Sequence, residues 1–326
     1  MSVVASTIPV SANLTSTVPN AGSMRVVSLL ASGTEIVCAL GLGETLVGRS
    51  HECDYPDWVK RLPVLSEPAF DVTVSSWEID CEVTRRIRSG EPLYELNSEL
   101  IWELQPDLVI TQAHCEVCAV TPNDVERSGC STPAAQVMAL TAGSLDGVFE
   151  GMMRVAQALG VECAGAALVA AEQARLERVR ARCAGKRAPS VVLLEWTDPI
   201  FAMGNWGPEL VEAANGDLLI GSAGEHSRAI PWEMVRGADP EVLVIAPCGY
   251  DLERALRERA TLEALNGWAD LRAVREGRVA FADGNRFFNR SGMTVVQTAE
   301  ILAEILHGEV MDAPAEGVHW QWIGKA

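Results

Sequence analysis

A long helix-favouring stretch, from Ser144 to Cys183, divides this sequence into two halves. Gly160 and Gly165 interrupt it only weakly, because a single glycine costs a helix about 1 kcal/mol relative to alanine. On each side of the stretch, short apolar segments alternate with amphipathic ones. The stretch therefore predicts a stiff helical spine between two α/β lobes.

The alternation on both sides of the spine predicts mostly parallel sheets. In the first half, "RVVSLL" and "TLVGRS" are expected strands on either side of a helix; in the second half, "SVVLLEW" and "EVLVIAP" are strands separated by helices. The order of elements repeats between the halves, although the sequence itself does not. We expect a flexible tail over 1–23, an N-terminal lobe over 24–143, the spine over 144–186 and a C-terminal lobe over 187–326.

The charge balance excludes some classes of partner. The chain has 26 Lys and Arg against 44 Asp and Glu, for a formal net charge of −18. A protein this acidic is repelled by phosphate backbones and anionic lipid surfaces, so we expect neither a nucleic-acid partner nor insertion into a membrane. The apolar runs are also shorter than the roughly 20 residues that a membrane-spanning helix needs.

The first 23 residues bear on location. They are rich in Ser and Thr, carry no charged side chain, and lack the basic start and sustained apolar stretch of a secretory signal. The nine cysteines are an odd number without the spacing of a small disulfide-linked domain. These features predict a cytoplasmic protein with reduced thiols, with organellar targeting by residues 1–23 as an alternative.

Two clusters of soft ligands stand out in the first half. His114, Cys115 and Cys118 lie in "TQAHCEVCAV", directly after the apolar strand "DLVI", and His51 and Cys53 lie in "SHECDYP". Open α/β sheets hold ligands at the carboxyl ends of their strands, and a CxxC pair with histidine suits a thiophilic metal or a redox disulfide. Since a single CxxC is a weak signal, partly buried thiols that shape a loop are an equal alternative.

Aromatic residues concentrate in the expected loops of the second half. Trp196, Phe201, Trp206, Phe287 and Phe288 offer apolar faces on which a large flat ligand can rest. Core packing is the alternative, particularly for Phe201 and for one of the two adjacent phenylalanines. Arg290 of the same half, flanked by Asn289 and Ser291, is suited to meet an anionic or amide group, or to lie on the surface at a helix start.

The segments "VVSLLASGTEIVCALGLGETLVGRS", "CDYP", "LQPDLVI" and "IPWEMV…ADPEVLVIAP" occur in an order that resembles the substrate-binding proteins of vitamin B12 and siderophore ABC importers. The similarity covers nearly everything after Met24, and "HECDYP" and "CEVCAV" resemble the cobalamin-binding branch. The resemblance implies two α/β lobes with mostly parallel sheets, joined by a rigid backbone helix, with the ligand in the cleft between the lobes.

The resemblance also implies a corrinoid or a related metal-chelate as the ligand, contacted by loops at the carboxyl ends of the strands. The predicted ligand-binding residues are His51, Glu52, Cys53, Tyr55, Gln112, His114, Cys115, Trp196, Asn205, Trp206, Phe287 and Arg290. Importer members dock on arginines of the membrane permease through one glutamate per lobe. The matching positions are Glu99 and Glu233, for which an ordinary solvated helix charge is the alternative.

Two other classes of function compete with corrinoid binding. Direct binding of zinc or another thiophilic metal would use His51, Cys53, His114, Cys115 and Cys118. A thiol redox protein or enzyme would use the CxxC pair. The sequence has no recognised nucleophile elbow, phosphate-cradling glycine loop or HExxH motif, so binding is favoured over catalysis.

Overall fold

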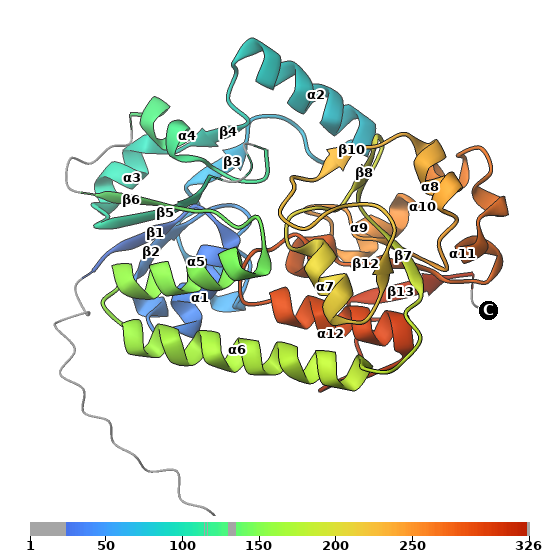
Figure 1. Cartoon of the computed structure of the whole chain (residues 1–326). Helices are drawn as coiled ribbons and strands as arrows, with labels where there is room; N and C mark the ends of the chain where they lie inside the picture. The colour runs from blue at the N-terminus through green and yellow to red at the C-terminus, as the bar shows by residue number, and fades with distance from the viewer. Residues whose placement is uncertain (1–23, 114, 116, 130–134, 325–326) are drawn as a thin grey trace, which may run out of the picture.

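The computed structural model describes residues 24–113, 115, 117–129 and 135–324. They form two α/β lobes that lie side by side, with one long helix running along both (Figure 1). Each lobe is built on a sheet of mainly parallel strands, which confirms the predicted fold class. Within the described residues, no helix combines the length and apolarity needed to cross a bilayer.

The N-terminal lobe is built on a parallel sheet in the order β2-β1-β5-β6. Its central strand β5 reads "LVITQ" and is buried along its whole length, as expected for a parallel strand covered on both faces. Helices α1 and α5 cover one face and α3 and α4 the other. The bounds are β1 Val26–Ser28, β2 Leu46–Arg49, β5 Leu108–Gln112, β6 Gln136–Leu140, α1 Ala31–Ala39, α3 Ser98–Leu104, α4 Pro122–Arg127 and α5 Leu145–Ala158.

The C-terminal lobe has a mixed sheet in the order β10-β8-β7-β11-β12-β13, with β9 also paired to β7. Strands β9, β7, β11 and β12 run parallel, whereas β8, β10 and β13 are antiparallel additions at its edges. The strands are β7 Ser190–Thr197, β8 Ile200–Ala202, β9 Asp217–Leu218, β10 Arg228–Ala229, β11 Val242–Ile245, β12 Val279–Ala282 and β13 Trp320–Ile323. The helices are α7 Gly207–Ala213, α8 Trp232–Ala238, α9 Leu252–Arg257, α10 Arg259–Glu263, α11 Arg272–Arg275 and α12 Val295–His307.

The two lobes repeat one topology. The order β2-β1-β5-β6 of the first sheet corresponds to β9-β7-β11-β12 of the second, and all of these neighbours are parallel. Helices α3 and α8, which precede the matching strands β5 and β11, both end in a left-handed residue with φ 42° and ψ 60°, Gln105 and Asp239. The repeated order seen in the sequence is therefore a repeated topology, and loops after matching strands occupy matching places.

Helix α6, Glu162–Cys183, is the spine that runs along both lobes (Figure 1). It packs on α5 of the first lobe and on α12 of the second, where Arg175 donates to both carboxylate oxygens of Glu300 at 2.6 and 2.5 Å. Gly165 permits the close approach to α5, because a Cβ there would lie 2.3 Å from that of Ala156. The helix-favouring stretch thus contains two helices, and α6 is the one that spans the lobes.

Helix α2, Ser76–Ser89, leaves the first lobe and packs on the second (Figure 1). It follows β3, Ser66–Pro68, and precedes β4, Tyr94–Leu96, which pair antiparallel at the base of the excursion. The Ser76 hydroxyl donates to Glu258 at 2.9 Å, and Ile79 joins the apolar core of the second lobe. A capping box between Ser75 and Glu78 fixes the start of the helix. The lobes are therefore connected by α2 as well as by α6.

Candidate functional site

A cavity of about 480 Å³, including the space open to solvent, lies between the two lobes. Its walls are loops that follow β1, β2 and β5 in the first lobe and β11 and β12 in the second, as expected for a ligand site at the carboxyl ends of parallel strands. The lining residues are Leu30, Ala31, Ser32, Glu52, Gln112, Cys118, Ala119, Cys248, Gly249, Gly284, Asn285, Asn289, Arg290 and Ser291.

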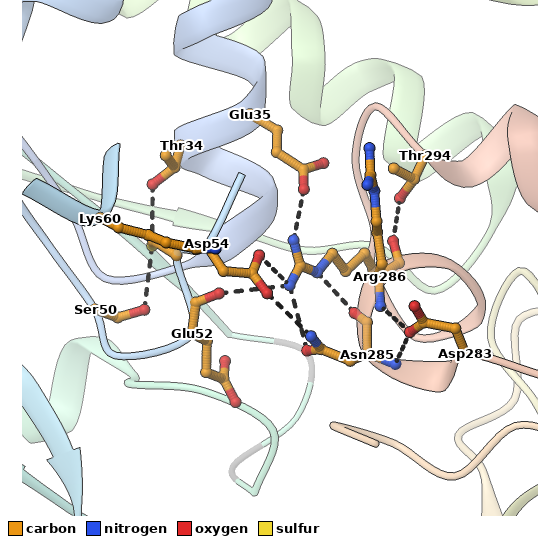
Figure 2. Close-up of polar contacts among 12 residues, drawn as sticks. Thr34, Glu35, Ser50, Glu52, Asp54, Lys60, Asp283, Asn285, Arg286 and Thr294 are labelled. Carbon is orange, nitrogen blue, oxygen red and sulfur yellow. Dashed lines mark hydrogen bonds and ion pairs between the residues drawn. The ribbon is translucent and has the colours of Figure 1, made fainter. Parts of the chain in front are cut away.

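A buried charge network joins the lobes at one side of the cavity. Arg290 donates to Glu35 at 2.6 Å, to Asp54 at 2.7 Å and to the Asn285 carbonyl at 2.7 Å, and the Asn285 amide donates to Asp54 at 3.0 Å. Figure 2 shows Glu35 and Asp54 reaching from the first lobe toward this part of the second. Asp283, at the end of β12, accepts the backbone N–H groups of Asn285 and Arg286 and so holds the turn in place.

The partners in this network shift one another's pKa values. Burial raises the pKa of Glu35, against the lowering effect of Arg290. Burial alone would lower the pKa of Arg290, but Glu35 and Asp54 outweigh it and raise that pKa. The Arg290 side chain is 5% exposed, so its charge is satisfied by protein groups and not by solvent.

Close packing reinforces the contact between lobes. Gly292 lies against Ser32, and a Cβ at position 292 would be 2.6 Å from the Ser32 Cβ. The Arg286 guanidinium lies over the Tyr55 ring, 4.0 Å from its centroid. Tyr55, a predicted ligand contact, therefore contacts the opposite lobe and is outside the cavity lining.

Three cysteines meet at the other side of the cavity. The Cys115 and Cys118 sulfurs are 2.8 Å apart, and Cys118 also interacts with Cys248 of the opposite lobe. The Cys118 thiol donates toward Cys115 and lowers the pKa of Cys115 to about 6, despite burial. Buried Gln112 holds the loop by bonding the backbone N–H of Cys115 at 3.2 Å and the Ala119 carbonyl at 3.1 Å. The predicted contacts Gln112 and Cys115 thus lie in or directly beneath the cavity wall.

Cys248 was missed by the sequence analysis, although a signal for it exists. It follows β11, and Cys115 follows β5, which is the matching strand of the other lobe. The repeated topology brings both loops to the cleft from opposite sides. Reading the element order as a structural repeat would have drawn attention to this cysteine.

His51 and Cys53 do not join the thiol group. Cys53 is completely buried, bonds Thr34 at 3.0 Å and Ser50 at 3.2 Å, and has its pKa raised by burial. The His51 ring bonds Ser66 at 3.1 Å, and burial lowers its pKa. His114 lies outside the described residues. Among the residues that are described, no group of three or more His, Cys, Asp or Glu is arranged to hold a metal ion, so the predicted zinc-type site is not supported.

The predicted aromatic wall lies elsewhere. Trp206 and Phe287 are 3% and 0% exposed and belong to the apolar core, where the Trp206 indole donates to the Phe288 carbonyl at 3.2 Å. Trp196 donates to the Ser76 carbonyl of α2 and packs on Tyr250. Asn205 adopts φ 51° and bonds the Glu225 backbone. None of these predicted contacts lines the cavity, because core packing and α2 occupy the faces that were expected to meet ligand.

Polar groups that the sequence analysis did not single out take their place. Ser32 Oγ and Glu35 Oε2 are buried without a hydrogen-bond partner among the described residues. The first lies in the cavity wall, which also includes Glu52, a predicted ligand contact whose pKa is raised to about 7 by burial. Unsatisfied buried polar atoms are rare in folded proteins, and a bound ligand or water is their usual partner.

A family model described as periplasmic binding protein matches residues 26–285 of this chain. The chain belongs to the periplasmic binding protein family. An uncharacterized ABC transporter substrate-binding lipoprotein of Bacillus subtilis (strain 168), YvrC, is 24% identical over 290 residues, which are 87% of this chain and 80% of the relative.

Solved structures of periplasmic binding proteins share the fold of this chain. A periplasmic heme binding protein from Pseudomonas aeruginosa has a TM-score of 0.68 at 22% identity, covering 92% of this chain and 97% of its own. The heme-binding protein RhuT from Roseiflexus sp. RS-1 has 0.65 at 25% identity, covering 88% and 99%. The vitamin B12 binding protein BtuF of Vibrio cholerae has 0.62 at 18% identity, covering 86% and 96%.

These comparisons confirm the family resemblance and correct the predicted location. The cobalamin branch itself is not confirmed, since heme and vitamin B12 binding proteins both share the fold. The prediction of a cytoplasmic protein is wrong, because the matching family is periplasmic and the curated relative is a lipoprotein. The composition of residues 1–23 misled that inference, which rested on a missing signal.

Proposed function

We propose that this periplasmic binding protein carries a corrinoid or a related metal-chelate in the cavity between its lobes and delivers it to an ABC permease. The observation that carries the proposal is the cavity itself. Loops from both lobes line it at the carboxyl ends of parallel strands, in a chain that belongs to a family of binding proteins. Relatives of this fold bear the names of heme and vitamin B12 binding proteins.

The charge of the cavity favours a neutral, amide-rich ligand. Arg290 is the cationic side chain in the lining, and Glu35 and Asp54 already neutralise it. Glu52 adds an acidic group rather than a basic one. The carboxylates of heme would meet no unpaired cation among the described lining residues, whereas the amide groups around a corrinoid can bond hydroxyl, amide and backbone groups. Ser32, with its unpartnered hydroxyl, is one such group.

The size of the cavity sets a condition on the proposal. The volume of about 480 Å³ includes space open to solvent, so the enclosed part of the cavity is smaller than this. A broad macrocycle needs more width, so binding requires the lobes to separate where Gly292 meets Ser32 and where Arg290 meets Asp54. Helix α6 continues along both lobes and can keep them aligned while this edge opens.

Docking on a permease is proposed for Glu99 and Glu233. Both are exposed in the first turn of a helix, and α3 and α8 occupy matching places in the two lobes at their outer sides (Figure 1). Each has an exposed apolar neighbour on its helix, Trp102 at 61% and Met234 at 43%. The repeat thus places one exposed glutamate with an apolar neighbour on each lobe.

A comparison of ligands tests the proposal. Purified protein is titrated with cobalamin, with hemin and with zinc, while its tryptophan emission and the ligand absorbance are recorded. We expect saturable binding of cobalamin with a Kd of roughly 1 μM or below, at least tenfold tighter than hemin, and unaffected by a chelator. Tight hemin binding without cobalamin binding would mean that the ligand is heme and not a corrinoid. Stoichiometric binding of zinc alone would overturn the proposal.

A further inference from the structure

We infer that Cys115, Cys118 and Cys248 form a redox-active thiol site in the wall of the cleft, in which a peroxide oxidises Cys115 and Cys118 to a disulfide. This activity is separate from ligand carriage and uses no bound ligand. The geometry that supports it is the close contact of the Cys115 and Cys118 sulfurs, which lie 2.8 Å apart, about 0.8 Å longer than a disulfide bond. Cys248 contributes a third thiol beside Cys118 from the opposite lobe.

The surroundings of the pair suit this chemistry. Cys118 lines the cleft and is exposed, whereas Cys115 is 5% exposed and reachable only by a small oxidant. The thiol of Cys118 donates toward Cys115, which lowers the pKa of Cys115 to about 6 and leaves it as thiolate near pH 7. Gln112 fixes the loop from within, so the two sulfurs stay together. Completely buried Cys53, whose pKa is raised, has none of these properties.

The step balances with hydrogen peroxide as the oxidant. The Cys115 thiolate attacks one peroxide oxygen, the O–O bond breaks and hydroxide leaves, so that Cys115 becomes a sulfenic acid. The Cys118 sulfur then attacks the Cys115 sulfur, an S–S bond forms, the S–O bond breaks, and the departing hydroxide takes the Cys118 proton as water. Two thiols are oxidised and the peroxide is reduced to water.

The test is mass spectrometry of the reduced full chain after one equivalent of hydrogen peroxide near pH 7 and alkylation of the remaining thiols. Trypsin leaves Cys115 and Cys118 together in peptide 89–127, Cys81 in peptide 62–85 and Cys248 in peptide 237–254. We expect oxidation to remove two hydrogens from peptide 89–127 and to protect both of its cysteines from alkylation. This oxidation should be at least about tenfold faster than oxidation of the exposed Cys81.

Two variants make the result specific. In Cys118→Ser, Cys115 should accumulate as a sulfenic acid, which dimedone traps when it is added together with denaturant. In Cys115→Ser, Cys118 should stay reduced while Cys81 reacts as before. Equal rates for Cys115 and Cys81 in the wild type would overturn the inference. A product that links only peptides 89–127 and 237–254 would also overturn it, because Cys115 and Cys118 would then not be bonded to each other.

Discussion

The structure places Arg290 at the cavity, as the sequence predicted, but gives its charge a different role. The sequence predicted a side chain poised to meet a ligand, and the structure places it in the cavity wall with its charge taken up by Glu35 and Asp54. No local pattern shows this pairing, because Glu35 and Asp54 are 255 and 236 positions away along the chain. Partners so distant in sequence become neighbours only through the complete fold.

Removing this cation should destabilise the protein strongly. A buried ion pair contributes little relative to apolar packing, but deleting one partner leaves an uncompensated buried charge. We expect Arg290→Met to lower the free energy of unfolding by about 3 kcal/mol or more, measured by urea denaturation. The control is Arg257→Met, which breaks an exposed pair with Glu253 and should change it by less than about 1 kcal/mol. Equal effects of the two variants would show that the interlobe pair is solvated.

Glu52 should make stability depend on pH. Its pKa is raised from 4.5 to about 7 by burial, so between these values the folded state holds a proton that the unfolded state has lost. The free energy of unfolding contributed by this group therefore falls as pH rises from about 4.5 to about 7. In Glu52→Gln this contribution is absent. The free energy of unfolding of the wild type minus that of the variant, measured by urea denaturation across this range, should decline as pH rises. A flat or rising difference would contradict the assignment.

Among the elements, the helical spine was predictable and helix α2 was not. Propensity summed over a long stretch is a strong local signal, and it located α5 and α6 correctly as helices. Helix α2 packs on the opposite lobe through Ser76 and Ile79. The periodicity of its sequence does not show which lobe the helix packs against. For the same reason Trp196, which bonds α2, was expected at the ligand instead.

The contact between α5 and α6 can be tested with a pair of glycines. Gly165→Ala adds a methyl group 2.3 Å from the Ala156 Cβ, whereas a Cβ on Gly237 of α8 would meet nothing within 4 Å. We expect the first change to lower the free energy of unfolding by about 1–2 kcal/mol through overpacking, despite the better helix propensity of alanine. The second should raise it by about 0.5 kcal/mol. Stabilisation by both would mean that the helices are not in close contact.

For the molecule as a whole, the architecture was predictable because it follows from alternating elements, but the contents of the cleft were not. The carboxyl ends of parallel strands indicated which loops meet, and the loops after β2 and β5 do line the cavity. Which side chain of a loop faces inward depends on packing behind it. Thus Glu52 lines the cavity while its neighbour Cys53 is buried, and Cys118 lines it above Cys115.

The central claim is that the ligand occupies the cavity between the lobes. Its most direct test is a calorimetric titration of cobalamin into the wild type and two variants that add the same bulk at different places. Cys248→Phe fills the cavity wall, whereas Cys163→Phe adds the ring to an exposed position on α6. With folding of both verified by circular dichroism, the account predicts at least about tenfold weaker binding for Cys248→Phe and an unchanged Kd for Cys163→Phe. Unchanged binding by both variants would contradict it.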